Sequence, residues 1–133
     1  QISTENEAFL FRVNQTGLTL PLITLLENPQ IAKVGLSLKD DFHKLHECAP
    51  FQPRGIIELQ EYVRMFGIEE MSLQKIFAIL FKQKISKRQQ LSNWEADELT
   101  IPQQQYAAID AWACLQIYNR LQQLKASGDF EIV

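Results

Sequence analysis

The hydrophobic positions near the C-terminal end of the chain recur with the period of an α-helix. At about 3.6 residues per turn, one side of this helix carries Tyr106, Asp110, Ala113, Ile117, Leu121 and Leu124. Thr100 followed by Pro102 is typical of a helix N-terminus, so we expect the helix to begin there. A phenol and a carboxylate therefore share an otherwise apolar stripe.

Asp110 is the residue of this stripe that needs an explanation. Burying an ionised carboxylate is costly unless a cation or several donors compensate its charge. No Lys or Arg stands four residues before Asp110 or three residues after it. A bound metal ion would supply the missing compensation.

The earlier part of the chain is predicted to alternate strands and helices. Residues 8–13 are expected to form a strand that pairs with residues 1–3 across a turn. Since the chain then begins inside a hairpin, we expect an earlier strand to be absent from this sequence. Further strands are expected at residues 31–35 and 55–59, and helices at residues 18–26, from Ser37, from Glu61 to Gly67 and at residues 73–81. This order predicts a single α/β domain over residues 1–133.

Two adjacent acids open the helix that follows Ser37, which we expect to be its N-cap. By the ~100° per residue of an α-helix, Asp41 lies roughly 60° from the centre of the buried side and Asp40 roughly 160° away. Asp41 therefore borders the core, at a point where a strand leads into a helix. Ligands bind at such points in α/β sheets. A favourable interaction with the helix dipole is the alternative role for Asp41.

Composition and charge limit the kinds of protein that this chain can be. With 133 residues and 46% hydrophobic content, it has enough apolar side chains for one globular core. No apolar run is long enough to span a membrane and no signal peptide is present, so we expect a cytoplasmic protein. Its net charge of −3 argues against holding nucleic acid by bulk electrostatics.

One short basic segment could still contact phosphates locally. Residues 82–88 hold four cations, of which Lys84, Lys87 and Arg88 are candidate phosphate contacts, and a solvated loop is the alternative. The grouping of His43, His46 and Cys48 could suggest zinc, but too few other His and Cys residues exist to complete a structural site, so surface and packing roles are favoured.

Four motifs together resemble the 3′–5′ exonucleases of the DEDDy type, including the Werner-syndrome-type exonuclease and ribonuclease D. In chain order they are Lys33-Val34-Gly35, then Asp41, then Ser92-Asn93-Trp94, and then Tyr106-Ala107-Ala108 with Asp110-Ala111. The likeness extends over roughly residues 31–121. Each motif alone would be a weak signal, whereas their order and context are fairly specific.

The resemblance implies an RNase H-like mixed sheet flanked by helices and four acids that bind two divalent ions, Mg²⁺ or Mn²⁺. Asp41 and Asp110 would supply two of these acids, and Tyr106 would orient or help deprotonate the attacking water. The family's first motif, an Asp-x-Glu pair on the first strand, has no counterpart here, so we expect this stretch by itself to have very poor activity. Trp94 would be a lid or packing residue, with base stacking as the weaker alternative.

Three functions follow from these observations. The first is a metal-dependent 3′–5′ exonuclease that acts on DNA or RNA 3′ ends and releases nucleoside 5′-monophosphates by a two-metal mechanism. The second is a nuclease-fold module that binds nucleic acid or a protein partner without cutting. The third and weakest is a helical interaction domain whose acids are incidental.

Overall fold

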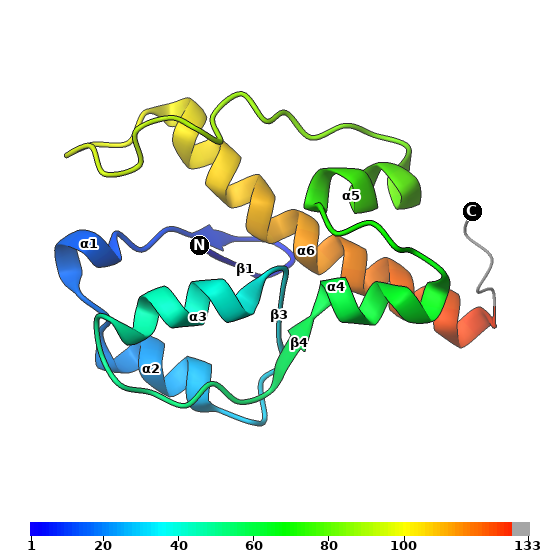
Figure 1. The fold of residues 1–133 in the computed structure, drawn as a ribbon, viewed down its shortest axis with the longest axis horizontal. Coiled ribbons are helices and arrows are strands. Elements are labelled where there is room, and N and C mark those ends of the chain that lie inside the picture. The colour runs from blue at the N-terminus through cyan, green and yellow to red at the C-terminus, as the bar shows by residue number, and fades with distance from the viewer. Residues whose placement is uncertain (129–133) are drawn as a thin grey trace.

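The computed structural model describes residues 1–128, and one long helix, α6 (Ile101–Ser127), runs through the middle of the fold. Figure 1 shows α6 crossing the molecule diagonally, with β1 and β3 near its middle and α5 alongside it. Both small sheets of the described chain contact α6. The helix therefore organises the packing, as its long apolar stripe predicts.

The N-terminal hairpin consists of β1 (Ile2–Ser3) and β2 (Ala8–Phe9), which pair antiparallel with Ile2 opposite Phe9. The second strand is shorter than the predicted residues 8–13. A single helical turn, α1 (Val13–Thr16), begins at the last residue of that predicted strand, and α2 (Leu20–Glu27) follows it. The hairpin itself is as predicted, because its turn brings the two short strands into register.

The second sheet pairs β3 (Lys33–Gly35) with β4 (Ile56–Glu58) in parallel, and α3 (Leu38–His46) lies between them in the chain. In the part of the chain that the structure describes, the strands form two separate pairs instead of one continuous mixed sheet. The prediction of α/β architecture is confirmed, whereas one mixed sheet is not what these residues form. Strands of two or three residues offer few ladder bonds with which to extend a sheet.

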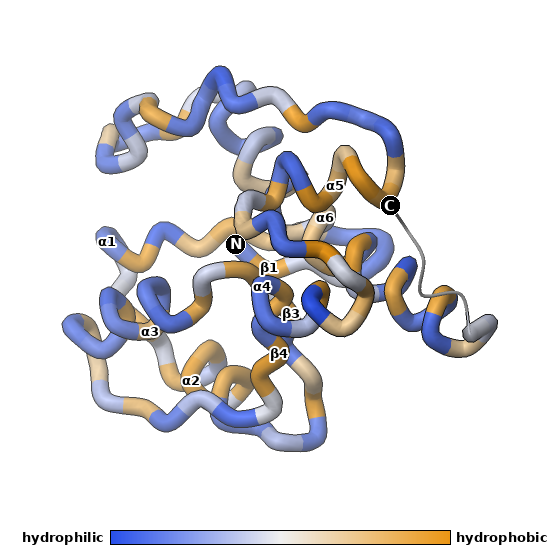
Figure 2. The backbone as a smooth tube through the Cα atoms, turned by 45° about the vertical axis from the view of Figure 1, so that its right-hand side comes forward, coloured by the Kyte–Doolittle hydropathy of each residue, from blue (hydrophilic) through white to orange (hydrophobic). Residues whose placement is uncertain are grey.

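The hydrophobic core lies between α6 and the elements that follow β4. These are α4 (Leu59–Tyr62), the 3₁₀ helix η1 (Val63–Phe66) and α5 (Leu73–Phe81). Its fully buried members include Leu59, Val63, Ile76, Ile117 and Leu121. In Figure 2 the apolar α5 gives way to a hydrophilic stretch of chain that leads back toward the start of α6. The predicted stripe of α6 therefore provides one wall of this core.

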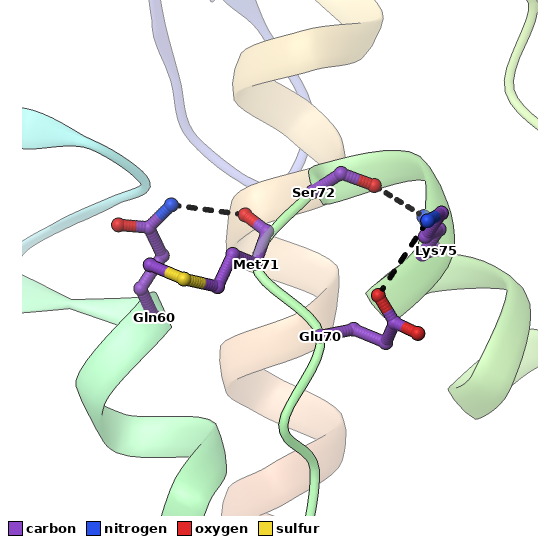
Figure 3. A network of polar contacts seen from close by, with 5 residues as sticks. All are labelled: Gln60, Glu70, Met71, Ser72 and Lys75. Atoms are coloured by element: carbon purple, nitrogen blue, oxygen red, sulfur yellow. Dashed lines mark hydrogen bonds and ion pairs between the residues drawn. The ribbon is translucent and has the colours of Figure 1, made fainter.

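Helix caps explain where α5 and α6 begin. The Ser72 hydroxyl accepts a hydrogen bond from the Lys75 backbone N–H at 3.2 Å, next to the predicted start of this helix at residue 73. Thr100 forms a complete capping box with Gln103 at the start of α6. Gln60 adds a tie between α4 and the residues before α5, since its side-chain amide donates to the Met71 carbonyl at 2.9 Å (Figure 3).

Ser37 is the N-cap residue of α3, as predicted, but its side chain does not cap the helix. Ser37 has left-handed backbone angles (φ 58°, ψ 39°) and its side chain makes no capping bond. Glu58, at the end of β4, accepts the hydrogen bond from the Leu38 backbone N–H at 2.8 Å instead. A side chain distant in sequence has taken the capping role, so local pattern could not reveal it.

None of the helices within residues 1–128 has the length and apolar content needed to cross a membrane.

Candidate active site

Asp110 is half-buried on the stripe of α6, between Tyr106 and the fully buried Ala113. The Gln1 side-chain amide donates a hydrogen bond to its carboxylate at 3.2 Å. Burial raises the pKa of Asp110 above its ordinary value, and the charge of Asp41 raises it further, while the bond from Gln1 opposes both. The Gln1 amide and the charge of the Gln1 amino group both act on this carboxylate, and no Lys or Arg side chain among residues 1–128 forms an ion pair with it, so its charge is only partly compensated.

Asp41 lies in the first turn of α3 and its side chain is largely exposed. Atoms packed around its carboxylate nevertheless raise its pKa, chiefly by desolvation. Lys44 lowers this pKa, whereas Asp40 and Glu58 raise it. Asp40 is also exposed, as its position on the helix predicted.

The structure brings the two aspartates into one neighbourhood, although 69 positions separate Asp41 from Asp110 in the sequence. The charge of Asp41 acts on Asp110, and both carboxylates act on the amino group of Gln1. Burial raises the pKa of the Cys114 thiol, one turn beyond Asp110, and the charges of Asp110, Glu58 and Asp41 raise it further. The charges of carboxylates on α3, β4 and α6 thus all act on the same thiol.

Tyr106 lies one helical turn before Asp110 and is partly buried. Desolvation raises the pKa of its hydroxyl, the charge of Asp110 raises it further, and a hydrogen bond with Gln74 opposes the shift. The indole ring of Trp94 lies 6.0 Å from the Tyr106 ring, centroid to centroid, at a tilt of 42°. Trp94 is therefore a packing neighbour of Tyr106, in line with the expectation of a lid or packing residue.

The candidate phosphate contacts lie in the irregular chain between α5 and α6. Lys84, Lys87 and Arg88 are all exposed. This segment returns to α6 at Ser92-Asn93-Trp94, so the basic residues precede the part of the chain that packs on Tyr106. Exposure is compatible with both the solvated loop and the phosphate contact.

Sequence reasoning missed the part played by Glu58. One oxygen of this carboxylate accepts from Leu38 N–H at the start of α3, and the other accepts from Gln60 N–H at the start of α4, at 3.2 Å. The signal was weak, because a Glu between a strand and a helix predicts at most a cap for the helix that follows it.

The grouping considered for zinc has other contacts. The His46 ring nitrogen Nε2 lies 2.8 Å from the Phe51 carbonyl oxygen, and the two rings pack at 4.4 Å between centroids. Cys48 is exposed and is not in a disulfide. Among residues 1–128, no group of three or more His, Cys, Asp or Glu side chains has an arrangement that could hold a metal ion.

The donors that are present can be tested against a hard divalent ion. Asp41 and Asp110 offer carboxylate oxygens, which suit Mg²⁺ or Mn²⁺ better than softer metals. Mg²⁺ commonly binds through only one or two carboxylates and completes its coordination with water and phosphate oxygens. The two aspartates therefore fit part of such a site, whereas two closely spaced ions would require further acids.

Comparison with known proteins identifies the family of this chain. Residues 1–125 match the family described as 3′-5′ exonuclease. Ribonuclease D of Haemophilus influenzae is 30% identical over 112 residues, which cover 84% of this chain and 28% of that protein. The bifunctional 3′-5′ exonuclease/ATP-dependent helicase WRN of Mus musculus is 29% identical over 123 residues, or 89% of this chain and 9% of that protein. The chain thus spans less than a third of either relative.

Solved structures have the same fold. NrnC of Brucella melitensis matches with a TM-score of 0.65 and 27% identity over 81% of this chain and 54% of that one. The EXO domain of Aedes aegypti Nibbler matches with a TM-score of 0.66 over 80% of this chain and 58% of that one, and at 22% identity it supports the fold alone. The chain therefore belongs to the 3′-5′ exonuclease family, as a domain similar to those of ribonuclease D and WRN.

Proposed function

We propose that this chain is the catalytic domain of a metal-dependent 3′–5′ exonuclease that hydrolyses nucleic-acid 3′ ends to nucleoside 5′-monophosphates. The observation that carries the proposal is the convergence of Asp41 and Asp110 from two distant helices, with Tyr106 one turn from Asp110. Burial raises the pKa of Asp110 and the charge of Asp41 raises it further, which is costly without a function.

Asp41 and Asp110 would hold a divalent ion, Mg²⁺ or Mn²⁺, through their carboxylate oxygens. When bound, such ions lower the pKa of a coordinated water and stabilise the charge on the phosphate, and a pair about 3.5–4 Å apart does so on both sides of the broken bond. The full two-metal arrangement needs acids in addition to these two.

Tyr106 would act as a hydrogen-bond donor. Its pKa is raised from the ordinary 10.0, so the hydroxyl keeps its proton throughout the neutral range. A protonated phenol beside Asp110 can orient a water molecule or a phosphate oxygen, and it is a poor base in the metal-free protein. In the metal-free protein the raised pKa therefore favours the orienting role of Tyr106 over the role of a base.

The substrate would be a nucleic acid with a free 3′ end. The similar protein NrnC was crystallised bound to pGG, which supports a nucleotide ligand for this fold. The exposed side chains of Lys84, Lys87 and Arg88 would contact phosphates. Trp94 would form one side of the site, where it packs on Tyr106.

A module that binds nucleic acid or a partner without cutting is the second candidate. It is favoured by one specific observation, that no group of three or more metal-ligating side chains exists among residues 1–128. In that case the fold would retain its binding surface, whereas its ion site would be too weak for hydrolysis.

Hydrolysis of a 5′-labelled single-stranded oligonucleotide by the full-length protein, measured during a Mn²⁺ titration, separates the two candidates. The enzyme is expected to shorten the oligonucleotide from its 3′ end and to release nucleoside 5′-monophosphates, and Asp41→Ala or Asp110→Ala should abolish this activity. Asp40→Ala is the matched control, because Asp40 is the exposed neighbour of Asp41 on the same helical turn. Protein that shifts the oligonucleotide in a gel but never shortens it would favour the binding module.

A further inference from the structure

Gln103 is the buried polar side chain of the described core, with 4% of its surface exposed. Its amide nitrogen donates to the Ser92 hydroxyl and to the Asn93 carbonyl, both at 3.0 Å. Its amide oxygen accepts from the Thr100 backbone N–H at 2.8 Å. All three partners lie outside the regular turns of α6, so this side chain joins the helix to the chain that precedes it.

The segment held by Gln103 has no regular secondary structure of its own. The hydroxyl of Ser92 donates onward to the Gln89 carbonyl at 2.7 Å, and the Trp94 indole donates to the Gln90 carbonyl at 3.2 Å. From the opposite direction, the Arg12 guanidinium donates to the carbonyls of Trp94 and Ala96. Residues 89–96 are therefore fixed by side chains from two other parts of the fold.

This fixed segment carries the ring that packs on Tyr106. Since Gln103 and Tyr106 lie three residues apart on α6, they share a face of the helix. One helical turn therefore holds both the anchor of the segment and the ring against which Trp94 packs, at 6.0 Å between centroids. A capping box uses the Gln103 side-chain oxygen but needs neither of its amide hydrogens. The two bonds from the amide nitrogen therefore lie outside the capping box.

We propose that Gln103 is a positioning residue that locks residues 92–94 onto α6 and thereby fixes the Trp94 ring beside Tyr106. The consequence for substrate binding depends on the proposed nuclease function, whereas the tether itself does not. Loss of the two amide donors should release Trp94 while α6 keeps its place in the core. The Ser92 hydroxyl and the Asn93 carbonyl would then lose a donor at a part-buried position, which destabilises the attachment of the segment.

Two substitutions separate the tether from the helix cap. Gln103→Glu keeps an oxygen that can accept from Thr100 N–H and loses both donors. Thr100→Ala removes the hydroxyl that accepts from Gln103 N–H at 3.2 Å and leaves the tether intact. Both are made with Trp112→Phe, so that Trp94 is the remaining tryptophan of this chain. Gln103→Met has a side chain of similar length that forms none of these hydrogen bonds. This variant tests whether Gln103 holds residues 92–94 if Gln103→Glu does not fold.

Trp94 fluorescence and acrylamide quenching report the tether directly. Gln103→Glu is expected to shift the emission to longer wavelength and to increase quenching, and Thr100→Ala is expected to lower the melting temperature with unchanged emission. An unchanged spectrum in both Gln103 variants would overturn the tether.

In the active protein, Gln103→Glu should raise KM for the oligonucleotide severalfold with a smaller change in kcat. An unchanged KM beside a shifted spectrum would overturn the effect on substrate binding. If no variant and no parent protein cuts, the nuclease proposal has failed and the fluorescence result still decides the tether.

Discussion

The backbone N–H of Leu38 donates to the Glu58 carboxylate at 2.8 Å, so the last residue of β4 fixes the first turn of the helix that carries Asp41. The other oxygen of the same carboxylate accepts from Gln60 at the start of α4. The Glu58 side chain thus caps the N-termini of two helices. Because Asp41 lies in the first turn of α3, this bond also fixes the backbone position of Asp41.

Replacing Glu58 should destabilise the fold, because two backbone donors lose a charged acceptor. Glu58→Ala is expected to lower the free energy of unfolding by about 1.5–3 kcal/mol, the usual range for a hydrogen bond to a charged group. Urea denaturation measures the change. Glu69→Ala, at an exposed position before α5, is the control and should change stability by no more than about 0.5 kcal/mol. Equal effects of the two variants would contradict the capping role of Glu58.

Asp110→Asn should make the metal-free protein more stable at neutral pH. The pKa of Asp110 is raised above 3.8, so the folded state holds this proton more tightly than the unfolded chain does. Stability is therefore lost as pH rises from 3.8 through the raised value, and the variant escapes this loss. Melting temperatures from pH 3 to pH 7 should diverge in favour of the variant as pH rises. Asp97→Asn, at an exposed position, should give no such divergence.

Divalent ions should make the parent protein more stable than Asp110→Asn, the reverse of the order expected without metal. Mn²⁺ that binds Asp41 and Asp110 in the folded state stabilises it by about 2.7 kcal/mol when its concentration is 100 times the dissociation constant. The melting temperature of the parent protein should therefore rise with added Mn²⁺ and fall back with a chelator, and that of Asp110→Asn should stay constant. A parallel rise in both proteins would place the ion elsewhere.

Tyr106→Phe should separate activity from stability. The change removes one hydroxyl and keeps the ring that packs on Trp94, so the fold should tolerate it. If the hydroxyl orients a reacting group, kcat is expected to fall by about 10² or more, within the range of positioned proton donors and acceptors. Because the raised pKa keeps Tyr106 protonated, the pH profile between 6 and 9 should keep its shape in the variant. Full activity in this variant would remove Tyr106 from the proposed site.

The two cysteines should differ sharply in reactivity. Burial, with added effects of Asp110, Glu58 and Asp41, raises the pKa of Cys114 to about 12, and this thiol is buried beside the core. Cys48 is exposed. A disulfide reagent at pH 8 should modify Cys48 quickly in the folded protein and Cys114 only in denaturant. Cys48→Ser should remove the fast phase, and two equally fast thiols would contradict the packing of α6.

Periodicity and caps determined much of this protein without tertiary information. The stripe of α6, the caps at Ser72 and Thr100, and the placement of Asp41 closer to the core than Asp40 all follow from local rules, because helical geometry fixes which residues share a face. The sequence also contained the Thr100 and Gln103 pair, three residues apart, which is the pattern of a capping box.

Only the tertiary structure decided which distant groups meet. The bonds from Glu58 to Leu38 and from Gln103 to Asn93 join segments whose separation in sequence carries no local signal. The approach of Asp41 to Asp110 likewise depends on how the segment of β3 and α3 is placed beside α6, which contacts β3. Hydrophobic burial sets that packing, and since burial is non-directional, a pattern along the chain can predict which face is covered but not what covers it.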